Sequence, residues 1–486
     1  MSNPTHSPLW IALRLPRLAL QVFLRGTPTP EPFAVVAEHR VVACDAKAAA
    51  RGVHPGMEQA TALALVAQLR LKDRDRAAET EALLGVAAWA GHLTPAVVPD
   101  FPATVLMEVS ASLRLWGGLP AILERLKAGM EELGFTCSLA CAPTSRAAAW
   151  FALQGKTTPQ PPGDGFEAAV AALPLQVLES ARERMDVFEA IGAASIGDVL
   201  ALPRPGVARR FGQALLDEID RGLGKLADPR SLFTPPERFH AEVEFPSEVT
   251  QAEALLFAGQ RLLAQLAGFL AARSAGVQRI SVKLFHRDSH TEATIGLVAP
   301  SRDARHFTLL LRERLGKAPL PAPVRALAVS ADNLQPAPGV PASLFPDQAA
   351  EAGNWMKLVE QLRARLGEQA VQGLAVQADH RPELATAAAP DGHAQMRLAL
   401  PPPLGSRPFW LLPKPRPLDA VEEARGDDRL QLLAGPERIE SGWWDGADIA
   451  RDYFIARSTG QSLLWIYRER PRGDAPQHWY VHGVFA

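Results

Sequence analysis

Residues 104–118, TVLMEVSASLRLWGG, constrain the fold of this chain more than any other stretch. Apolar residues fill every second position from Val105 to Val109, and this period of two predicts a strand that is buried on at least one face. The stretch closes on a Gly-Gly turn. Its polar positions, Glu108, Ser110 and Ser112, lie where an enzyme that uses two metal ions would present carboxylates. Because only Glu108 is acidic, the stretch predicts the framework of a metal site without its ligands.

The length and the composition indicate a multidomain globular chain. A chain of 486 residues predicts about three to four domains. Hydrophobic residues make up 47% and charged residues 21%, so the chain can bury sizeable cores and is not disordered throughout. The formal net charge of -2 gives no basic excess, so a DNA-binding role would need local basic patches.

Cysteine usage and hydropathy bear on the compartment. The three cysteines, Cys44, Cys137 and Cys141, are few and odd in number, which indicates a reducing environment. Cys137 and Cys141 have no second Cys or His pair nearby, so we interpret them as core thiols rather than as metal ligands. We find no apolar run that approaches the roughly 18 residues of a membrane span and no signal peptide. We therefore expect a soluble, cytoplasmic protein with no membrane partner.

Strands and helices alternate along the first 154 residues. Residues 10–23 begin as a hydrophobic strand that Pro16 should end, because proline removes a backbone donor. Further β-rich and helical segments follow at residues 31–42, 45–71, 77–90, 119–133, 135–142 and 145–154. This order predicts an α+β unit around a central sheet. The composition of residues 156–165, KTTPQPPGDG, is typical of a linker.

Residues 173–224 show only helical patterns, in short helices joined by glycine turns that are similar to paired helix-hairpin-helix units. Backbone N–H groups at a Gly206 turn, and at the N-terminus of a helix opened by Arg209 and Arg210, can face a phosphate. We therefore predict DNA contacts at Gly206, Arg209, Arg210 and Gly212. The alternative is a pair of arginines on an ordinary solvated helix face, and the sequence leaves it open.

The second half of the chain contains a further α+β region and an aromatic C-terminal segment. Residues 235–330 have β-α-β-β-α-β order, which predicts a small split βαβ domain. A proline- and glycine-rich stretch and an amphipathic helix at residues 355–366 follow. All three tyrosines lie within residues 453–480, close to Trp443, Trp444 and Trp465. This density predicts a compact β-rich segment that uses the aromatic side chains in its own core or as a binding face.

The order of these regions resembles that of the Y-family translesion DNA polymerases over roughly residues 9–345. The C-terminal blocks RPFWLLPKPRPL, GPERIESGWWDG, RDYFIAR and WYVHGVFA are similar to a catalytically inactive branch of that family, which occurs in bacterial mutagenesis cassettes. The resemblance implies an α+β, multidomain fold. Its expected parts are a palm (1–165) with inserted fingers (about 28–75), a helix-hairpin-helix thumb (166–232), a little finger (233–335), a linker (336–350) and a C-terminal partner-binding region (351–486).

Departures from the family pattern fall on its catalytic motifs. The motif VDMDAFF, whose first aspartate binds both metals, corresponds here to LRLPRLA. Arg14 and Pro16 thus replace the acids, and Ala19 replaces the aromatic gate against ribonucleotides. The motif SIDEAFLDLTG aligns with MEVSASLRLWG, which puts Val109 and Ser110 at the Asp-Glu positions.

The other catalytic positions are also changed. Glu108 is one residue out of register, and one residue along a strand reverses the face. The finger motif YEAR, which holds the triphosphate, falls on residues 46–49, including Ala46 and Ala49, and the Asn-Lys after the third palm strand falls on Thr144 and Ser145. A cation such as Arg14 would repel a divalent ion. We therefore predict no metal site, no cofactor and no polymerase catalysis.

The resemblance implies a non-catalytic adaptor in SOS-induced translesion DNA synthesis and mutagenesis. The implied partners are primer-template DNA, the β sliding clamp, an error-prone C-family DNA polymerase and ImuA, a RecA-like accessory protein. A Gln-x-x-Leu-Phe peptide docks in the clamp in this family; PASLF keeps Leu344 and Phe345 but has Pro341 for the glutamine. The alternative is that this hydrophobic segment packs against a domain of the same chain. In the C-terminal region, Trp443, Trp444 and Trp465 are the predicted partner contacts.

Two other functions stay open at this point. A weakly active polymerase of the same fold would use Glu108, Asp45 or a repositioned acid as its metal ligands. A helix-hairpin-helix module of a different class would bind DNA without a clamp or a polymerase partner.

Overall fold

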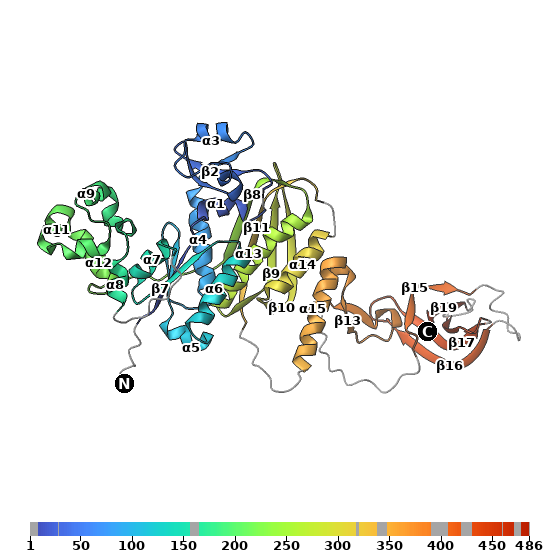
Figure 1. Ribbon diagram of the computed structural model, residues 1–486. Coiled ribbons are helices and arrows are strands. Elements are labelled where there is room, and N and C mark those ends of the chain that lie inside the picture. Colours follow the sequence, from blue (N-terminus) through green and yellow to red (C-terminus); the bar gives the residue numbers. More distant parts are fainter. Residues whose placement is uncertain are drawn as a thin grey trace, which may run out of the picture. The chain divides into compact units, whose positions relative to one another are not determined.

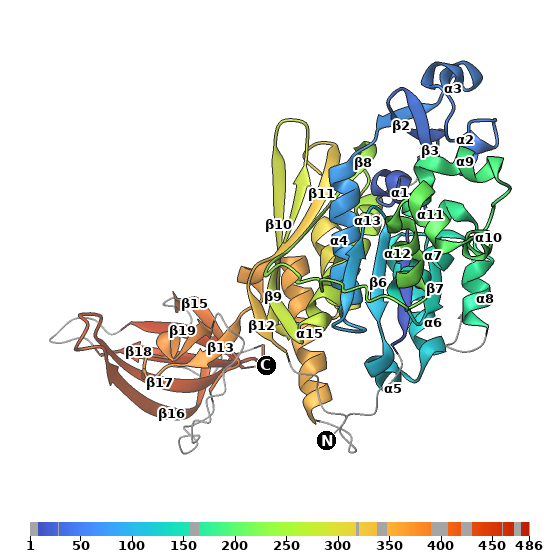
Figure 2. The same cartoon turned by 90° about the vertical axis from the view of Figure 1, so that its left-hand side faces the viewer.

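The computed structural model describes residues 8–27, 29–155, 165–316, 320–337, 348–389, 407–418, 430–458, 460–470 and 478–485. The chain divides into two compact units, Met1–Leu366 and Gly367–Ala486. Figures 1 and 2 show the helices and strands of each unit from two directions.

The palm in the first unit is a four-stranded antiparallel sheet that is buried on both faces. The strand order is β5-β6-β1-β7, with β1 (Trp10–Arg14), β5 (Val97–Asp100), β6 (Thr104–Glu108) and β7 (Ser138–Ala142). Because side chains alternate along β1, Ile11 and Leu13 enter one core and Ala12 enters the other. The first core includes α4 (Arg76–Ala90) and α6 (Leu119–Leu133), and the second includes α7 (Ser145–Leu153).

The strand predicted over residues 104–118 is shorter than expected. It ends at Glu108, and η1 (Ser110–Ser112) and α5 (Leu113–Trp116) follow before the Gly-Gly turn. The Glu108 carboxylate folds back and accepts a hydrogen bond from the Ser110 backbone N–H at 3.0 Å, which turns the chain out of the sheet. Cys141 lies in the palm core as predicted, and burial raises the pKa of its thiol to about 11.

The fingers are a small three-stranded sheet with its own core. The strand order is β3-β2-β4, and β2 and β4 are parallel. The buried residues of the strands and helices, such as Val36, Val41 and Ala62, form one small cluster. The elements of this region are β2 (Phe33–Ala37), β3 (Arg40–Cys44), α2 (Ala46–Ala49), α3 (Gln59–Leu65) and β4 (Arg70–Asp73). Helix α1 (Leu18–Leu24) precedes them and packs in the palm core.

The thumb is a group of short helices that packs against α7 of the palm (Figure 2). Thr144 Oγ1 donates a hydrogen bond of 2.6 Å to the Gly222 carbonyl, and a Cβ atom at Gly222 would lie 2.1 Å from the Trp150 ring. The thumb elements are α8 (Phe166–Ala171), η2 (Leu175–Val177), η3 (Glu179–Arg184), α9 (Met185–Ala190), α10 (Ile196–Ala201), α11 (Arg204–Phe211) and α12 (Gln213–Gly222).

The little finger has the β-α-β-β-α-β order that the sequence predicts. Its sheet has the order β10-β9-β11-β8, and β12 (Leu334–Pro336) pairs with β9. The elements are β8 (Phe239–Val249), α13 (Ala252–Ala272), β9 (Ala275–Phe285), β10 (His290–Ser301), α14 (Ala304–Gly316) and β11 (Val324–Ala331). Helices α13 and α14 share one hydrophobic core with the strands. With the palm and thumb, this region confirms the predicted α+β, multidomain fold class.

Helix α13 corrects one statement made from the sequence. It has 21 residues, and an 18-residue window within it has a mean hydropathy of 1.4, so by length and composition it is long and apolar enough to cross a membrane. Ten of its residues are buried, and seven of these, among them Leu262, Leu266 and Phe269, pack in the little-finger core. The hydrophobicity of α13 is therefore explained by burial within the protein.

Helix α15 (Gln348–Leu366) follows the little finger and packs against α14 and β10. Glu360 accepts a hydrogen bond of 2.6 Å from the Val298 backbone N–H and also contacts His306 Nε2; both side chains are buried. Lys357 forms an ion pair of 3.1 Å with Asp303. These contacts fix the second half of α15 on the little finger.

The second unit contains a five-stranded antiparallel sheet of order β15-β19-β18-β17-β16 and a hairpin. The aromatic rings of Tyr453, Trp465, Tyr467 and His482 pack together at its centre. The strands are β13 (Gly373–Val376), β14 (Thr386–Ala389), β15 (Trp410–Pro417), β16 (Leu430–Ser441), β17 (Ile449–Ser458), β18 (Leu463–Glu469) and β19 (Trp479–Val484). Two short helices, η4 (Glu368–Ala370) and η5 (Pro382–Leu384), belong to the same unit.

Candidate nucleic-acid interface and metal-site positions

A row of polar residues crosses one end of the palm sheet. Arg14, the last residue of β1, pairs with Thr104 on β6 and with Ser138 on β7, and Thr104 pairs in turn with Asp100 on β5. Residues directly opposite each other in neighbouring strands project from the same face of a sheet. Asp100, Thr104, Arg14 and Ser138 therefore form one row, which we call the polar row. It lies on the face that packs against α7 and the thumb.

The register of the sheet corrects the alignment of the second metal motif. Glu108 pairs with Trp10, and the Val109 N–H donates to the Leu9 carbonyl at 2.9 Å. Four residues of strand separate Trp10 from Arg14, which is roughly 14 Å. Val109 is also fully buried in the palm core. Val109 and Ser110 therefore lie at the wrong end of β1 to share an ion with position 14.

The residues that do lie beside Arg14 come from the turn between β5 and β6. The Leu15 N–H donates a hydrogen bond of 2.8 Å to the Ala103 carbonyl, and Thr104 is the β6 partner of Arg14. A site that held ions between β1 and β6 would draw its second set of ligands from Ala103 and Thr104. Neither residue has a carboxylate.

The two acids considered as substitute ligands are both engaged with the backbone. Glu108 Oε1 accepts hydrogen bonds from the Leu9 N–H at 3.2 Å and the Ser110 N–H at 3.0 Å. Asp45 is the N-cap of α2 and accepts from the Ala48 N–H at 2.8 Å. Each acid satisfies backbone donors that would otherwise lack a partner, a local role that explains why it is present.

Four other catalytic positions of the family pattern carry no charged or hydrogen-bonding side chain, whereas Lys47, in the finger motif, donates from Nζ to the Thr29 carbonyl at 2.7 Å. Pro16 lies in the turn between β1 and α1, and Ala19 lies within α1. Ala46 and Ala49 are the first and last residues of α2 and are exposed. None of these side chains can hold a phosphate or an ion by a polar contact.

The acid of the polar row is part of an ion-pair network that the sequence analysis missed. Arg230 Nη1 lies 3.2 Å from Asp100 Oδ1, and Arg230 Nη2 lies 2.8 Å from Asp228 Oδ2. Asp228 also accepts from Arg146 Nη2 at 3.2 Å and from Ser145 Oγ at 3.3 Å. The network joins β5 and α7 to the segment between thumb and little finger. Its members lie up to 130 residues apart in the chain, so no local pattern reveals it.

Burial and the neighbouring arginines set the charge states in this network. Burial would raise the pKa of Asp228, but hydrogen bonds and charges from Arg146 and Arg230 outweigh it and hold that pKa below its ordinary value. For Asp100, burial dominates and raises the pKa despite the Arg230 charge. The lowered pKa favours the ionised form of Asp228, which serves as the counter-ion of two guanidinium groups.

Arg14 places a positive charge at the centre of the polar row. Its side chain is half-buried, burial lowers the pKa of its guanidinium, and it has no carboxylate partner among the residues that the structure describes. A cation about 4 Å from a divalent ion would repel it by about 8 kcal/mol at an effective dielectric of about 20. Within the described ranges, no group of three or more His, Cys, Asp or Glu side chains is arranged to hold a metal ion.

The thumb presents the predicted arginines, but not in the predicted positions. Arg209 and Arg210 are exposed in the last turn of α11 instead of opening a helix, and Gly206 lies in the first turn of α11 instead of in a loop. The turn between α11 and α12 is at Gly212, which has a φ of +97°. Arg184 Nη1 donates to the Arg210 carbonyl at 3.2 Å, which adds a third exposed arginine to this end of the thumb.

Another turn of the thumb has its backbone donors occupied. Asp198 Oδ2 accepts hydrogen bonds from the N–H groups of Ala194 and Ser195 at 2.9 and 2.8 Å, in a capping box at the start of α10. These amides are therefore not available to a phosphate. The arginines at the end of α11 are the better candidate contacts.

The chain is similar to known families and to named relatives. Residues 20–152 match the impB/mucB/samB family, and residues 237–344 match the C-terminal domain of the impB/mucB/samB family. Two relatives named Protein ImuB, from Caulobacter vibrioides strains NA1000 / CB15N and ATCC 19089 / CIP 103742 / CB 15, are 29% identical over 465 residues. The match covers 89% of this chain and 100% of each relative. The chain is an ImuB-like homologue of the Y-family DNA polymerases.

Two solved structures match about two thirds of the chain. A Dbh ternary complex matches 66% of this chain and 98% of its own chain, at 15% identity and a TM-score of 0.38. A Y-family DNA polymerase chimera of Dbh and Dpo4 matches 67% of this chain and 99% of its own, at 15% identity and a TM-score of 0.38.

The predicted partner-binding tryptophans in the second unit differ in exposure. Trp443 is 78% exposed and Trp444 is 56% exposed, so both remain available as predicted contacts. Trp465 is 2% exposed, and its ring stacks on Tyr453 at 4.0 Å between centroids. The assignment of Trp465 to a partner surface is therefore wrong, because its ring is part of the core. Leu344 and Phe345 lie outside the described residues.

Proposed function

We propose that this ImuB-like chain is a non-catalytic Y-family polymerase homologue that acts as an adaptor during SOS-induced translesion DNA synthesis in the cytoplasm. The observation that carries the proposal is the position of Arg14 at the centre of the polar row. The acid in that row, Asp100, is paired with Arg230, and the substitute acids Glu108 and Asp45 hold backbone amides. This arrangement opposes two-metal phosphoryl transfer, which needs carboxylates to bring two ions together.

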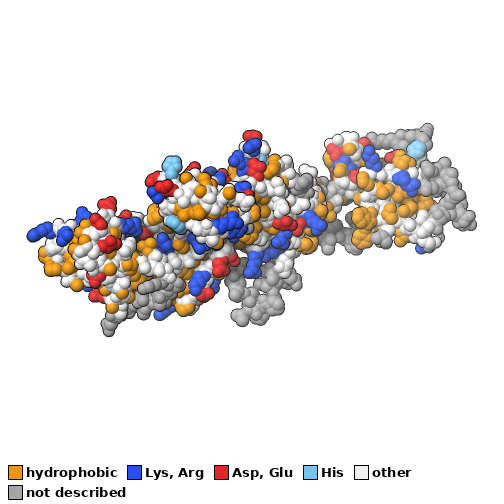
Figure 3. All heavy atoms as spheres, turned by 45° about the horizontal axis from the view of Figure 1, so that its top comes forward, with side chains coloured by type: hydrophobic (Ala, Val, Ile, Leu, Met, Phe, Trp, Pro, Cys, Tyr) orange, Lys and Arg blue, Asp and Glu red, His pale blue; other side chains and the backbone are white. Residues whose placement is uncertain are grey.

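The exposed arginines at the end of α11 support the proposed binding of primer-template DNA. Arg184, Arg209 and Arg210 lie together there, and each guanidinium can donate several hydrogen bonds to one phosphate. Figure 3 shows acidic and basic side chains intermingled over the visible face of the first unit. DNA binding would therefore rest on local contacts of this kind instead of on a broad basic field.

The proposed protein partners are the β sliding clamp, ImuA and an error-prone C-family DNA polymerase. The exposed rings of Trp443 and Trp444 support a protein-binding surface on the second unit, because large exposed aromatic side chains are typical of interface centres. The weakly active polymerase remains the second candidate. It is less well supported, because Glu108 and Asp45 are tied to the backbone.

The experiment that tests this proposal is primer extension by the purified chain on intact and abasic templates, with Mg²⁺ and then Mn²⁺, beside a DNA-binding titration. We expect no nucleotide incorporation and measurable binding to primer-template. Substituting Arg209→Ala with Arg210→Ala should weaken binding and lower the slope of log K against log salt by roughly two, because two phosphate contacts are lost.

A matched variant, Lys414→Ala with Arg457→Ala, removes two exposed charges from the second unit and should leave the DNA affinity within about twofold of the wild type. Template-directed incorporation by the wild type would refute the non-catalytic role. Equal losses of affinity in both double variants would refute the thumb contact.

The clamp contact gives a second prediction. The double substitution Leu344→Ala and Phe345→Ala should lower the affinity for the β sliding clamp by at least tenfold, because two apolar anchors of an extended peptide are deleted. The measurement is surface plasmon resonance on immobilised clamp. Pro341→Gln restores the family's glutamine and should strengthen binding. A wild-type chain that does not bind the clamp would instead favour a DNA-binding module of a different class.

A further inference from the structure

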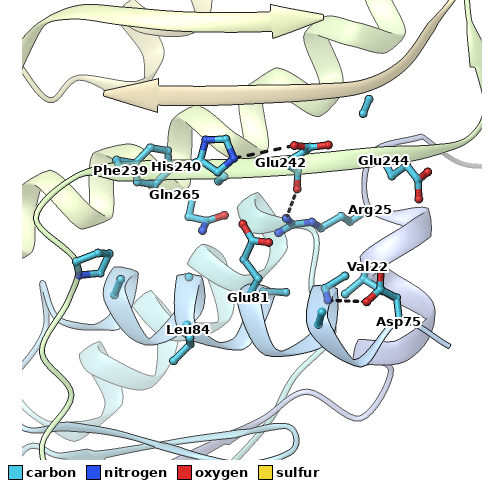
Figure 4. A pocket seen from close by; sticks show the side chains of 18 of the residues that line it. Val22, Arg25, Asp75, Glu81, Leu84, Phe239, His240, Glu242, Glu244 and Gln265 are labelled. Atoms are coloured by element: carbon cyan, nitrogen blue, oxygen red, sulfur yellow. Dashed lines mark hydrogen bonds and ion pairs between the residues drawn. The ribbon is translucent and has the colours of Figure 1, made fainter. Parts of the chain in front are cut away.

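A pocket of about 820 Å³ lies between α4 of the palm and β8 of the little finger (Figure 4). Helix α1 and helix α13 complete its walls. A volume of this size is typical of sites for small molecules. The pocket is distinct from the polar row, which lies on the opposite face of the palm sheet from α4.

Four carboxylates line this pocket from two domains, and one of them, Asp75, is engaged as the N-cap of α4, where it accepts a hydrogen bond from the Ala78 N–H. Glu81 rises from α4, and Glu242 and Glu244 project from β8 (Figure 4). In the described part of the chain, Glu81 and Glu244 form no ion pair, and the only charged partner of the Glu242 carboxylate there is His240, whose Nε2 lies 4.0 Å away. Burial raises the pKa of Glu242; the charges of Glu81 and Glu244 act in the same direction and His240 opposes them. The acids are therefore close enough to repel one another.

A buried arginine at the back of the pocket does not neutralise the pair on β8. Arg25 is 6% exposed, and its Nη2 donates to the Glu242 backbone carbonyl at 3.3 Å instead of to the carboxylate. The Arg25 guanidinium instead interacts electrostatically with the Glu81 carboxylate. Arg238 and Arg325 also line the pocket, but in the described part of the chain neither forms an ion pair with Glu242 or Glu244.

A second, independent feature of the pocket indicates a bound ligand. Gln265 of α13 is 6% exposed and lines the pocket, and its amide makes no hydrogen bond within the described residues. In Figure 4 its side chain points into the space between α4 and β8. An unpaired amide on a mostly buried side chain favours a polar ligand that supplies the missing hydrogen bond. It lies against Gly85, where a Cβ atom would be 2.1 Å from Gln265 Nε2.

The walls between these polar groups are apolar. Phe269, Phe285 and Leu84 line the pocket together with alanines of α4. A metal ion does not suit this site, because the described acids are not grouped closely enough to coordinate one. The matching chemistry is an alkyl chain that carries ammonium groups: methylene groups contact the apolar walls, and the charged groups meet the carboxylates.

We propose that this pocket binds a linear aliphatic polyamine. Its ammonium groups pair with Glu242 and Glu244, and a secondary amine donates a hydrogen bond to the Gln265 amide oxygen. A lysine side chain of another protein offers the same alkylammonium chemistry, so the test has a separate arm for it. The site does not depend on DNA binding or on the adaptor role.

The test is isothermal titration of the full-length chain with spermidine. Strand β8 supplies a matched control, because Glu248 is an exposed glutamate of the same strand that does not line the pocket. Glu242→Gln and Glu244→Gln should each weaken spermidine binding by at least fivefold, and Glu248→Gln should leave it within twofold. Gly85→Ala, which forces the Gln265 amide from its place, should also weaken binding.

Several outcomes would overturn the proposal. Mg²⁺ at matched ionic strength should not displace spermidine. Full displacement by Mg²⁺, or a loss of binding in Glu248→Gln equal to that in Glu244→Gln, would show that the interaction is general charge screening. Tighter binding of an Nα-acetyl-lysine amide than of spermidine would assign the pocket to a protein lysine instead. Circular dichroism of each variant confirms that the chain is folded, so a loss of binding reports on the pocket.

Discussion

Replacing Glu218 with alanine is expected to cost the thumb about 3–5 kcal/mol of unfolding free energy. Glu218 of α12 is 6% exposed, and its carboxylate accepts hydrogen bonds from the backbone N–H groups of Glu179 and Ser180, both at 3.0 Å, and from the Ser180 hydroxyl. The alanine variant leaves these donors buried without an acceptor. It also removes the negative charge that lies 3.8 Å from Arg146 Nη1.

This loss should be measured locally, because a multidomain chain has no single unfolding midpoint. Hydrogen exchange of residues 166–223 should accelerate in the Glu218→Ala chain while the little finger stays protected. The DNA affinity should fall as well, because α12 holds α11 and its arginines in place. Glu189→Ala, which removes an exposed acid of α9, is the control. It should change the opening free energy measured by hydrogen exchange by less than about 0.5 kcal/mol. Unchanged protection in Glu218→Ala would show that the carboxylate does not support the thumb.

Replacing Gly268 with alanine is expected to destabilise the junction of palm and little finger by about 2–3 kcal/mol. A Cβ atom at Gly268 of α13 would lie 2.0 Å from Trp89 Cδ1, and one at Gly129 of α6 would lie 2.1 Å from the same ring. The Trp89 ring is thus held between two helices by glycines, and it is 6% exposed. An alanine must displace either the ring or α13, and close-packed interiors do not absorb such a change.

The sign of this effect separates packing from helix propensity. Within a helix, glycine to alanine ordinarily stabilises by about 0.5–1 kcal/mol. Gly206→Ala in α11, where the added Cβ meets nothing within 4 Å, should show that ordinary gain or no change. The readout is thermal unfolding followed by intrinsic tryptophan fluorescence, with limited proteolysis to locate the loss. A Gly268→Ala chain that is as stable as the wild type would mean that Trp89 repacks freely, and the pocket beside α4 should then keep its spermidine affinity.

Local patterns predicted the elements of this protein and their order. Proline chemistry placed the end of the first strand before Pro16, and β1 ends at Arg14. The period of two placed a strand at Thr104–Glu108, and the β-α-β-β-α-β order of the little finger followed from alternating helical and strand patterns. These features depend on the spacing of apolar side chains and on single-residue backbone preferences, which are local properties.

The candidate site was only partly accessible from local patterns. The positive charge at Arg14 follows from comparison of a short motif, and its place at the end of β1 agrees with that reading. The assignment of the second motif to Val109 and Ser110 was wrong, because motif similarity does not specify which residues pair across two strands. Trp465 was misassigned for a related reason: aromatic density cannot distinguish a core ring from an exposed one.

By itself, then, the sequence determined the fold class, the element order, the cationic replacement at position 14 and the resemblance to Y-family polymerases. Tertiary structure alone decided that Thr104 faces Arg14, that Asp228 pairs with Arg146 and Arg230, and that Glu242 and Gln265 share a pocket. The physical reason is that register, ion pairing and burial arise between segments far apart in the chain. They depend on which surfaces pack together, and the spacing of residues within one segment does not specify that choice.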